Sequence, residues 1–308
     1  MGIRITETKR FLPIESRDNV YYEEKFELPV GWIEARTGIK TRHYAVASVT
    51  SSDLAYNAAK NLTNAPKAQF LINATASPDS LLPSNANRIA EQLGLVNPLC
   101  FDLMAGCSGF LHLFVTAYSL LNSGLYTAGI ITASEKMSTI IDQEDKNTAS
   151  LFGDAGAAWF VEYDPNDNVH AIYLGSDSTG VSDLLIPVST ENKREMVKMD
   201  GKKVYKNAVN KLSFSISEAL NLAKMTIEDI DYIISHQANA RIIDQVREQL
   251  GAPEEKVLLS ITHLGNISNA SIPFTFDLYK EQLIGKTVIF TAFGAGYNYG
   301  AIVLTILP

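Results

Sequence analysis

The sequence predicts an α/β fold built from two related halves. Short apolar runs alternate along the chain with longer amphipathic stretches, which is the pattern of strands layered with helices. Segments of the first half recur at a near-constant distance in the second half, which indicates a duplicated unit. With 308 residues, 46% of them hydrophobic and 19% charged, the chain is long enough for about two domain-sized units and apolar enough for a large core.

The composition excludes several classes of protein. The 34 acidic and 26 basic residues give a net charge of −8, so the bulk surface does not attract nucleic acid. Two cysteines cannot build a disulfide scaffold, and no apolar run reaches the roughly 18 residues that span a membrane. The first residues lack the apolar core of a signal peptide, so we expect a cytoplasmic protein. The histidines and cysteines show no metal-ligand spacing, and no metal site is predicted.

The apolar runs predict strands, and the amphipathic stretches predict helices. The predicted strands are Gln69–Asn73, Gly129–Ala133, Ala157–Glu162, Tyr232–Ser235, Val257–Ser260 and Val288–Thr291. The predicted helices are Ser52–Leu62, Ser84–Leu93, Ser108–Asn122, Asn207–Ala223, Ala240–Leu250 and Ser271–Gln282.

Three successive segments carry the repeat. A strand and helix that close with Glu91-Gln-Leu-Gly recur 157 residues later as a strand and helix that close with Glu248-Gln-Leu-Gly. Cys107 and Asn266, each before an apolar helix, lie 159 residues apart, and the strands after those helices keep the same spacing. Any two α/β halves look alike to some degree, so unrelated halves are the alternative.

The repeat predicts two halves, residues 1–164 and residues 165–308. The first would carry the cysteine, and the second would carry a histidine and an asparagine. Equivalent loops of two such halves converge on one cleft, so one site can draw residues from both.

Cys107 is the candidate nucleophile. Small residues on both sides of it, in the segment Asp102–Phe110, allow a tight turn from a strand into an apolar helix. A helix N-terminus favours the thiolate, and a thiolate can attack a thioester and hold the acyl group. The alternative is a small buried residue without chemistry, because free cysteines are often core residues.

His236 and Asn266 are candidate partners of the cysteine. His236 ends an apolar strand and opens a helix, which is a position at the rim of a cleft in an α/β sheet. There it could donate to a developing oxyanion or exchange protons with a nucleophile. Asn266 lies in a turn rich in Gly, Asn and Ser, and its carboxamide can donate to an anion at any pH. The alternatives are a histidine at a helix start and a turn or capping asparagine.

The glycine-rich turn Phe293–Gly300 follows a strand and leads into the final strand. Its exposed N–H groups could line an oxyanion hole, but the turn does not match a phosphate-binding fingerprint, because no helix follows it. The elbow motif of serine hydrolases is absent, and its nearest match, Gly106-Cys-Ser-Gly109, offers a cysteine.

Taken in order, these segments resemble the β-ketoacyl-acyl carrier protein synthase III family of the thiolase superfamily. The resemblance spans nearly the whole chain, and the ordered combination is far more specific than any one motif. The matching segments are Gly31–Ile39, Cys107, Phe152–Asp154, Met199–Gly201, His236–Asn239, Gly265–Asn266 and Phe293–Gly300.

The resemblance implies a thiolase-like five-layer αβαβα fold with two pseudo-symmetric halves, and a homodimer. Acyl-CoA would acylate Cys107, and His236 with Asn266 would assist decarboxylation of malonyl-acyl carrier protein, giving a β-ketoacyl thioester. The backbone N–H groups of Cys107 and Ala295 would hold the acyl oxygen. The reaction implies no cofactor, since acyl-CoA is a substrate. The Cys-His-Asn set resembles the CoA-primed initiating branch, because elongating synthases have two histidines.

The resemblance also implies residues that bind substrate. Trp32 would stack on the CoA nucleotide, Arg36 would meet a phosphate, and Thr37 belongs to the same set. Asn239 would orient the site, and Arg241 would meet the carrier protein or the pantetheine phosphate. Lys146 stands where an arginine often clamps the adenine, and Leu82 replaces an aromatic residue that limits the acyl pocket across the dimer.

Several positions depart from the family's pattern. Asn269 replaces a usual alanine, and Arg247-Glu-Gln-Leu replaces a double lysine that would attract an acidic carrier protein. These departures favour, as the alternative, a specialised acyltransferase of secondary metabolism with a different acceptor. A catalytically silent dimer partner is a third reading, which the retained Cys107, His236 and Asn266 disfavour.

Overall fold

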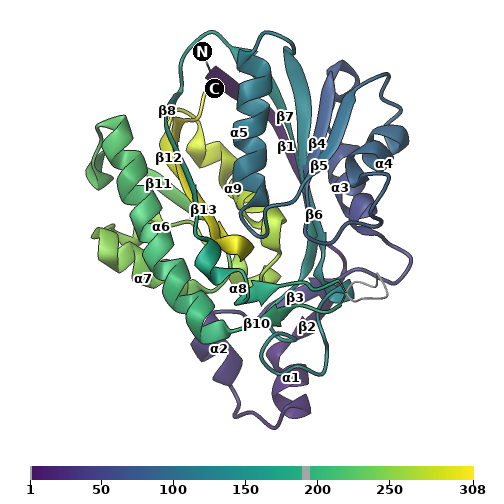
Figure 1. Cartoon of the computed structure of the whole chain (residues 1–308), viewed down its shortest axis with the longest axis vertical. Coiled ribbons are helices and arrows are strands. Elements are labelled where there is room, and N and C mark those ends of the chain that lie inside the picture. The colour runs from purple at the N-terminus through teal and green to yellow at the C-terminus, as the bar shows by residue number, and fades with distance from the viewer. Residues whose placement is uncertain (1, 189–194) are drawn as a thin grey trace.

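Two mixed sheets form the frame of the molecule (Figure 1). The computed structural model describes residues 2–188 and 195–308. The strand order of the first sheet is β1 (Gly2–Phe11), β7 (Asp154–Asp164), β6 (Ala128–Lys136), β4 (Phe70–Ala74) and β5 (Leu99–Leu103). The strand order of the second sheet is β11 (Tyr232–Ser235), β12 (Thr287–Gly294), β13 (Asn298–Thr305) and β8 (Val169–Ser176).

Helices cover both sheets and fill the space between them. In Figure 1, α5 (Gly109–Asn122) and α9 (Ser271–Leu283) lie in the middle, in contact with strands of both sheets. On the right, α3 (Ser51–Ala59) and α4 (Asn85–Gln92) cover the first sheet. On the left, α6 (Gly201–Ala223) packs on the second sheet and α7 (Ala240–Leu250) packs against α6. The predicted five-layer αβαβα fold is confirmed.

Smaller elements gather at the lower end of the molecule in Figure 1. Two short antiparallel pairs lie there, and α1, α2 and α8 accompany them. Their bounds are β2 (Glu15–Asp18), β3 (Thr41–Tyr44), β9 (Leu184–Leu185), β10 (Lys198–Met199), α1 (Asn19–Lys25), α2 (Trp32–Thr37) and α8 (Ile261–Leu264). No helix among residues 2–188 and 195–308 combines the length and the apolar character needed to cross a bilayer.

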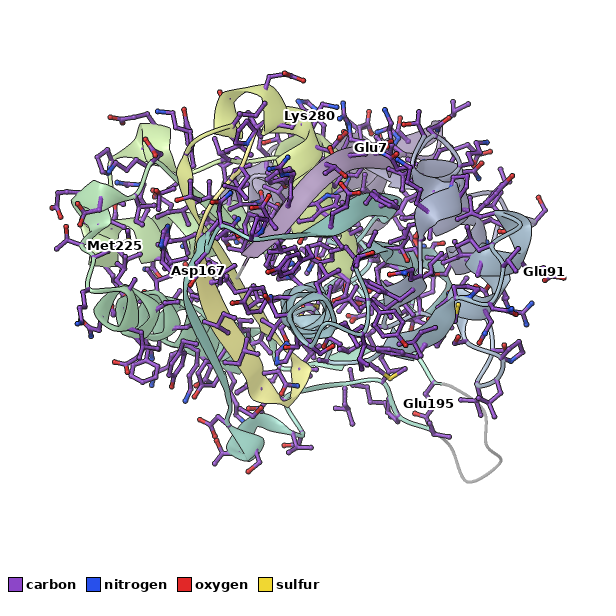
Figure 2. All side chains as sticks on the ribbon, turned by 90° about the horizontal axis from the view of Figure 1, so that it is seen from above. Glu7, Glu91, Asp167, Glu195, Met225 and Lys280 are labelled. Atoms are coloured by element: carbon purple, nitrogen blue, oxygen red, sulfur yellow. The ribbon has the colours of Figure 1, made fainter. Side chains whose placement is uncertain are left out.

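The central core is built around Trp159 of β7, which is fully buried. Its indole meets Phe110 of α5 edge to face with the ring centroids 5.0 Å apart, and it meets Phe276 of α9 at 4.6 Å. Phe290 of β12 lies 5.9 Å away. Figure 2 shows α5 nearly end-on, with side chains filling the space around it. Because α5 is apolar on almost every side, it can be buried between two sheets.

Most predicted elements are present, with ends shifted by a few residues. The helix predicted from Asn207 begins six residues earlier, because Asp200 caps it by accepting from Lys203 N at 3.2 Å. Strands β1, β5 and β8 were not predicted as separate elements. The mixture of charged and apolar residues in β1 hides its alternation.

The predicted strand Val257–Ser260 is wrong. Only Val257 forms an isolated bridge, with Ile233. The buried side chain of Gln237 takes the place of a neighbouring strand, because its amide donates to Leu258 O at 3.2 Å and accepts from Ser260 N at 3.0 Å. A side-chain amide thus satisfies backbone groups that a strand ladder would otherwise pair.

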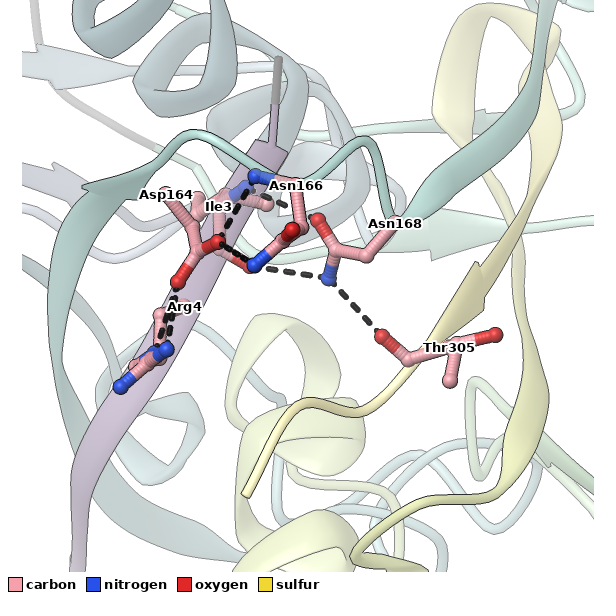
Figure 3. Close-up of polar contacts among 6 residues, drawn as sticks. All are labelled: Ile3, Arg4, Asp164, Asn166, Asn168 and Thr305. Atoms are coloured by element: carbon pink, nitrogen blue, oxygen red, sulfur yellow. Dashed lines mark hydrogen bonds and ion pairs between the residues drawn. The ribbon is translucent and has the colours of Figure 1, made fainter.

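The connection between β7 and β8 joins the two sheets, and the predicted boundary after residue 164 falls in it. Figure 3 shows Asn168 between them, donating to Ile3 O of β1 at 3.0 Å and to Thr305 O of β13 at 2.8 Å. Asp164 pairs with Arg4 of β1 at 2.7 Å. The two bonds of Asn168 link β1 of the first sheet to β13 of the second at this end, and the pair of Asp164 and Arg4 joins β7 to β1 within the first sheet. The division into two halves stays a prediction.

Candidate active site

A mainly apolar cavity of about 290 Å³ opens where the two sheets meet, and residues of both halves line it. Cys107, His236 and Asn266, which are far apart in the sequence, all lie on its wall. Met137, Phe152 and Val197 are among its apolar lining residues. The structure therefore brings the three candidate residues to one apolar site that a small organic group could enter.

Cys107 lies in the turn between β5 and α5, two residues before the helix begins. The turn is so tight that Gly106 has φ +56°, and a Cβ on Gly106 would lie 2.7 Å from the backbone N of Ala295. From the other side, a Cβ on Gly294 would lie 2.6 Å from Cys107 N. The glycine-rich turn before β13 thus packs directly on the cysteine turn, and Ala295 lines the cavity.

The thiol of Cys107 is neutral at rest. Part of the residue is accessible through the cavity, but protein surrounds the sulfur on its other sides. Burial raises the pKa of Cys107 to about 11, a contact with Ser268 lowers it, and the charge of Glu135 raises it further. We expected the start of α5 to favour the thiolate, but burial outweighs that effect, so the thiol must lose its proton as it reacts.

His236 follows β11 and is buried beside α9. Burial lowers the pKa of His236 to about 4, so the imidazole is neutral. Its Nδ1 lies 2.8 Å from the Ser271 hydroxyl, which also accepts a hydrogen bond from Gln237 N at 3.3 Å. The Ser271 hydroxyl is buried, and among the described residues Nδ1 is the one acceptor within reach of its proton, so Ser271 donates to Nδ1 and the ring carries its proton on Nε2. The ring can act as a hydrogen-bond donor through Nε2.

The loop before α9 fixes the carboxamide of Asn266. Its backbone is held by Leu151 O at 2.8 Å and by Gly153 N at 3.1 Å. Its side-chain Oδ1 accepts from Ser268 N at 2.8 Å. Because the oxygen of the amide is occupied in this way, its NH₂ group is the part that can donate to a ligand in the cavity. Asn266 and His236 therefore both offer neutral donors.

The predicted substrate-binding residues of α2 and α7 meet at one side of the cavity. Asn239, which lines the cavity, donates to Arg36 O at 3.1 Å. The guanidinium of Arg36 lies 4.1 Å from the centre of the Trp32 ring. Arg241 is exposed at the start of α7. Thr37 is buried, and its hydroxyl donates to the backbone of α2, so it holds the end of that helix.

Two predicted residues lie apart from the cavity within the chain. Lys146 is exposed on the loop after β6. Leu82 is 86% exposed on the loop between β4 and α4 and does not line the cavity. The role predicted for Leu82 concerns the acyl pocket of a second subunit, and both roles stay predictions.

Sequence reasoning missed two residues beside the thiol. Glu135, at the end of β6, is completely buried, and Ser268 lies between this carboxylate and Cys107. An acidic residue near the carboxyl end of a strand that begins as an apolar run was a signal for Glu135. Ser268 gave no such signal, because its contacts arise only when the two halves come together.

Known proteins resemble this chain over nearly its whole length. The family model of 3-Oxoacyl-[acyl-carrier-protein (ACP)] synthase III matches residues 101–178, and the model of its C-terminal part matches residues 220–306. The β-ketoacyl-[acyl-carrier-protein] synthase III of Acholeplasma laidlawii is 38% identical and that of Geobacillus kaustophilus is 36% identical, each covered over 99% of both chains.

Among solved structures, the 3-oxoacyl-(acyl carrier protein) synthase III of Pseudomonas aeruginosa is similar to this chain with a TM-score of 0.94. It is 31% identical, and the alignment covers 100% of this chain and 99% of that one. The likeness therefore extends over the whole fold.

Proposed function

Because the chain belongs to the 3-oxoacyl-[acyl-carrier-protein] synthase III family, we propose that acyl-CoA acylates Cys107 and that the acyl group then condenses with malonyl-acyl carrier protein. The chain is an acyltransferase of fatty acid biosynthesis, a β-ketoacyl-acyl carrier protein synthase III-like condensing enzyme. The observation that carries the residue assignment is the single cavity lined by Cys107, His236 and Asn266.

The first step is transfer of the acyl group. The sulfur of Cys107 attacks the thioester carbonyl, and the backbone N–H groups of Cys107 and Ala295 stabilise the oxyanion. The close packing of the two turns at Gly106 and Gly294 supports this pairing. The C–S bond of acyl-CoA then breaks, and the coenzyme leaves as the thiol.

The second step is decarboxylation and condensation. His236 and Asn266 donate to the thioester oxygen of the malonyl group as carbon dioxide leaves, so the negative charge of the enolate is stabilised without a base. The enolate carbon attacks the carbonyl of the acyl-cysteine, and the sulfur leaves with its electron pair to be protonated by water. Two neutral donors suit this role, because they bind the charge only as it develops.

Substrate recognition is assigned to the side of the cavity where α2 meets α7. Trp32 stacks on the CoA nucleotide, and Arg36, Arg241 and Lys146 meet its phosphates or those of the carrier protein. The hydrogen bond of Asn239 to Arg36 O holds the start of α7 to α2, and that of Thr37 to Ile33 O holds the end of α2. We place the reaction in the cytoplasm, in a homodimer, with no cofactor, and sedimentation of a monomer at micromolar concentration would refute the dimer.

The test is a mass-spectrometric panel of acyl-CoAs. We expect the intact mass to rise by one acyl group with at least one primer, and Cys107→Ala to abolish the adduct. Cys100→Ala is the matched control, because Cys100 is the other free thiol and lies on neighbouring β5. An adduct that survives in Cys107→Ala, or no adduct with any primer, contradicts the proposal.

A different acceptor is the second candidate, and the surface of α7 favours it. Arg247 is paired with Asp244 at 2.7 Å and with Glu248 at 3.5 Å, so its charge is neutralised where an acidic carrier protein would need a basic patch. Release of carbon dioxide from a malonyl thioester by the acylated enzyme supports condensation. Acyl transfer to an alcohol or amine without such release supports the alternative.

A further inference from the structure

A buried carboxylate lies one hydroxyl away from the nucleophile. Glu135 has no exposed surface, and both of its carboxylate oxygens accept hydrogen bonds. Ser77 donates to Oε2 through its hydroxyl at 2.6 Å and its backbone N at 3.1 Å. Asn269 donates to Oε1 through its amide at 2.6 Å. Burial raises the pKa of Glu135 and these donors lower it, and because N–H groups donate to both oxygens, the contacts favour the ionised carboxylate.

Ser268 connects this carboxylate to Cys107. Its hydroxyl donates to Oε1 of Glu135 at 3.0 Å and lies 3.6 Å from Sγ of Cys107. A hydroxyl has a single proton and two lone pairs, and an ionised carboxylate is a far stronger acceptor than a thiol sulfur. The serine proton therefore points to Glu135, and a lone pair of the same oxygen is left to accept the S–H of Cys107.

The imidazole cannot take the thiol proton in this arrangement. Ser271 donates to Nδ1 of His236, so Nε2 carries the proton and has no lone pair to offer. The lowered pKa of His236 also disfavours the imidazolium. The histidine is thus set up as a donor for the second step, and the first step needs a different proton acceptor.

We propose that Ser268 and Glu135 form the proton relay of acyl transfer, in which the thiol proton of Cys107 moves to Ser268 and the proton of Ser268 moves to Glu135. The relay rests on the proposed acylation of Cys107. Ser268 touches the reacting sulfur, and Glu135 acts through Ser268.

The relay balances within one acyl transfer. As the bond from Sγ to the carbonyl carbon forms, Cys107 loses its proton to Oγ of Ser268, and Oε1 of Glu135 receives the serine proton. When the thioester C–S bond of acyl-CoA breaks, the leaving sulfur takes the electron pair. The proton then returns from Glu135 through Ser268 to that sulfur. The products are acyl-cysteine and the free thiol of CoA. Burial raises the pKa of Glu135, which strengthens it as a transient base.

Asn269 connects the relay to α5, the helix that follows the nucleophile. Its Oδ1 accepts from Phe110 N in the first turn of α5 at 3.0 Å, while its amide donates to Glu135. One side chain of the second half therefore fixes the carboxylate of β6 relative to the turn of Cys107. This contact sets the position of the relay and takes no part in the proton transfer.

The experiment measures the two half-reactions separately in four variants. Acylation is followed by rapid quenching and intact mass with the best acyl-CoA of the panel, and decarboxylation is followed as carbon dioxide released from a malonyl thioester. We expect Ser268→Ala and Glu135→Gln to slow acylation about 100-fold, within the usual range for general acid–base catalysis. We expect decarboxylation to change less than about threefold in Ser268→Ala, because Ser268 N still holds Asn266.

Two further variants separate the relay from a structural role. Glu135→Asp keeps the carboxylate on a shorter stem and should recover part of the acylation rate lost in Glu135→Gln. Asp154→Asn is the matched control, because Asp154 is also completely buried, its pKa is also raised by burial, and it bonds Ala45 N and Ser138 instead of the site.

The outcomes are distinct. Acylation of Ser268→Ala at the wild-type rate, or equal slowing of both half-reactions in Ser268→Ala, overturns the relay and leaves the proposed function standing. Wild-type protein that forms no adduct on Cys107 overturns the proposed function and the relay with it. If Glu135→Gln does not fold, Ser268→Ala alone decides, because it removes only a hydroxyl.

Discussion

At the scale of single residues, the site keeps both its nucleophile and its two hydrogen-bond donors uncharged at rest. Burial lowers the pKa of His236 and raises that of Cys107, so both groups are neutral in the resting site. A neutral imidazole with a fixed tautomer suits hydrogen-bond donation to an enolate. The thiol needs a separate route for its proton, which is the role inferred for Ser268 and Glu135.

The buried imidazole predicts a loss of stability in acid. The folded state holds the pKa of His236 near 4, below the ordinary value of 6.5, so only the unfolded state binds this proton between those values. The stability is fully present above about pH 6.5 and falls as the pH approaches 4, with about 2 kcal/mol lost by pH 5.

Urea unfolding at pH 7.5 and pH 5 measures this effect. We expect the loss to be about 2 kcal/mol larger in the wild type than in His236→Asn, which lacks the titrating ring. An equal loss in both proteins would show that the imidazole is not the group that titrates. The other acidic and basic groups titrate in both proteins and cancel in the difference.

Cys107 and His236 could be predicted from sequence because each follows a strand and precedes a helix, which places them at sheet edges. Asn266 follows α8 instead, and it could be predicted because it lies in a polar turn before the apolar helix α9. The family resemblance gave all three their roles. Ser268, Glu135 and Ser271 could not be predicted in the same way. Their significance lies in contacts across 133 and 35 positions of sequence, which no local pattern encodes.

At the scale of elements, one side chain decides whether a segment is a strand. The short apolar run favoured a strand at Val257–Ser260, but Gln237 occupies hydrogen-bonding positions that a neighbouring strand would use. A hydrophobic pattern predicts which side chains are buried. It does not predict which group will form hydrogen bonds with the backbone of the segment. The same side chain supports the loop that leads to Asn266.

Gln237→Ala tests this role of the side chain. It would leave Leu258 O, Ser260 N and Ile261 N without their partner in a buried site, so we expect the free energy of unfolding to fall by about 2–4 kcal/mol. Gln249→Ala is the matched control, because Gln249 is exposed and makes one side-chain bond, with Ser213 at 2.7 Å. Its effect should stay within about 0.5 kcal/mol. Equal effects in the two variants would contradict this account of the loop.

At the scale of the whole molecule, the two sheets are linked by the helices packed between them. Figure 1 shows α5 and α9 between the sheets, and each helix contacts strands of both. The five-layer arrangement could be predicted from the repeat and the family resemblance. The packing between the layers could not be predicted, because it depends on which aromatic rings contact one another between the two sheets.

Trp159 is the residue at which this packing can be tested. It belongs to the first sheet, yet its ring meets Phe276 of α9 and Phe290 of β12 as well as Phe110 of α5. Trp159→Leu removes these ring contacts and leaves space between the layers, so we expect a loss of about 3 kcal/mol in the free energy of unfolding.

Because the ring lies between the layers, the whole molecule should lose stability together in Trp159→Leu. Far-ultraviolet circular dichroism reports all the helices, and hydrogen exchange reports β4 of one sheet and β12 of the other separately. If the sheets form one unit, protection of both strands falls by the same free energy. Loss of protection in β4 alone would show that the halves unfold independently, and the active site between them would then open without unfolding of the second sheet.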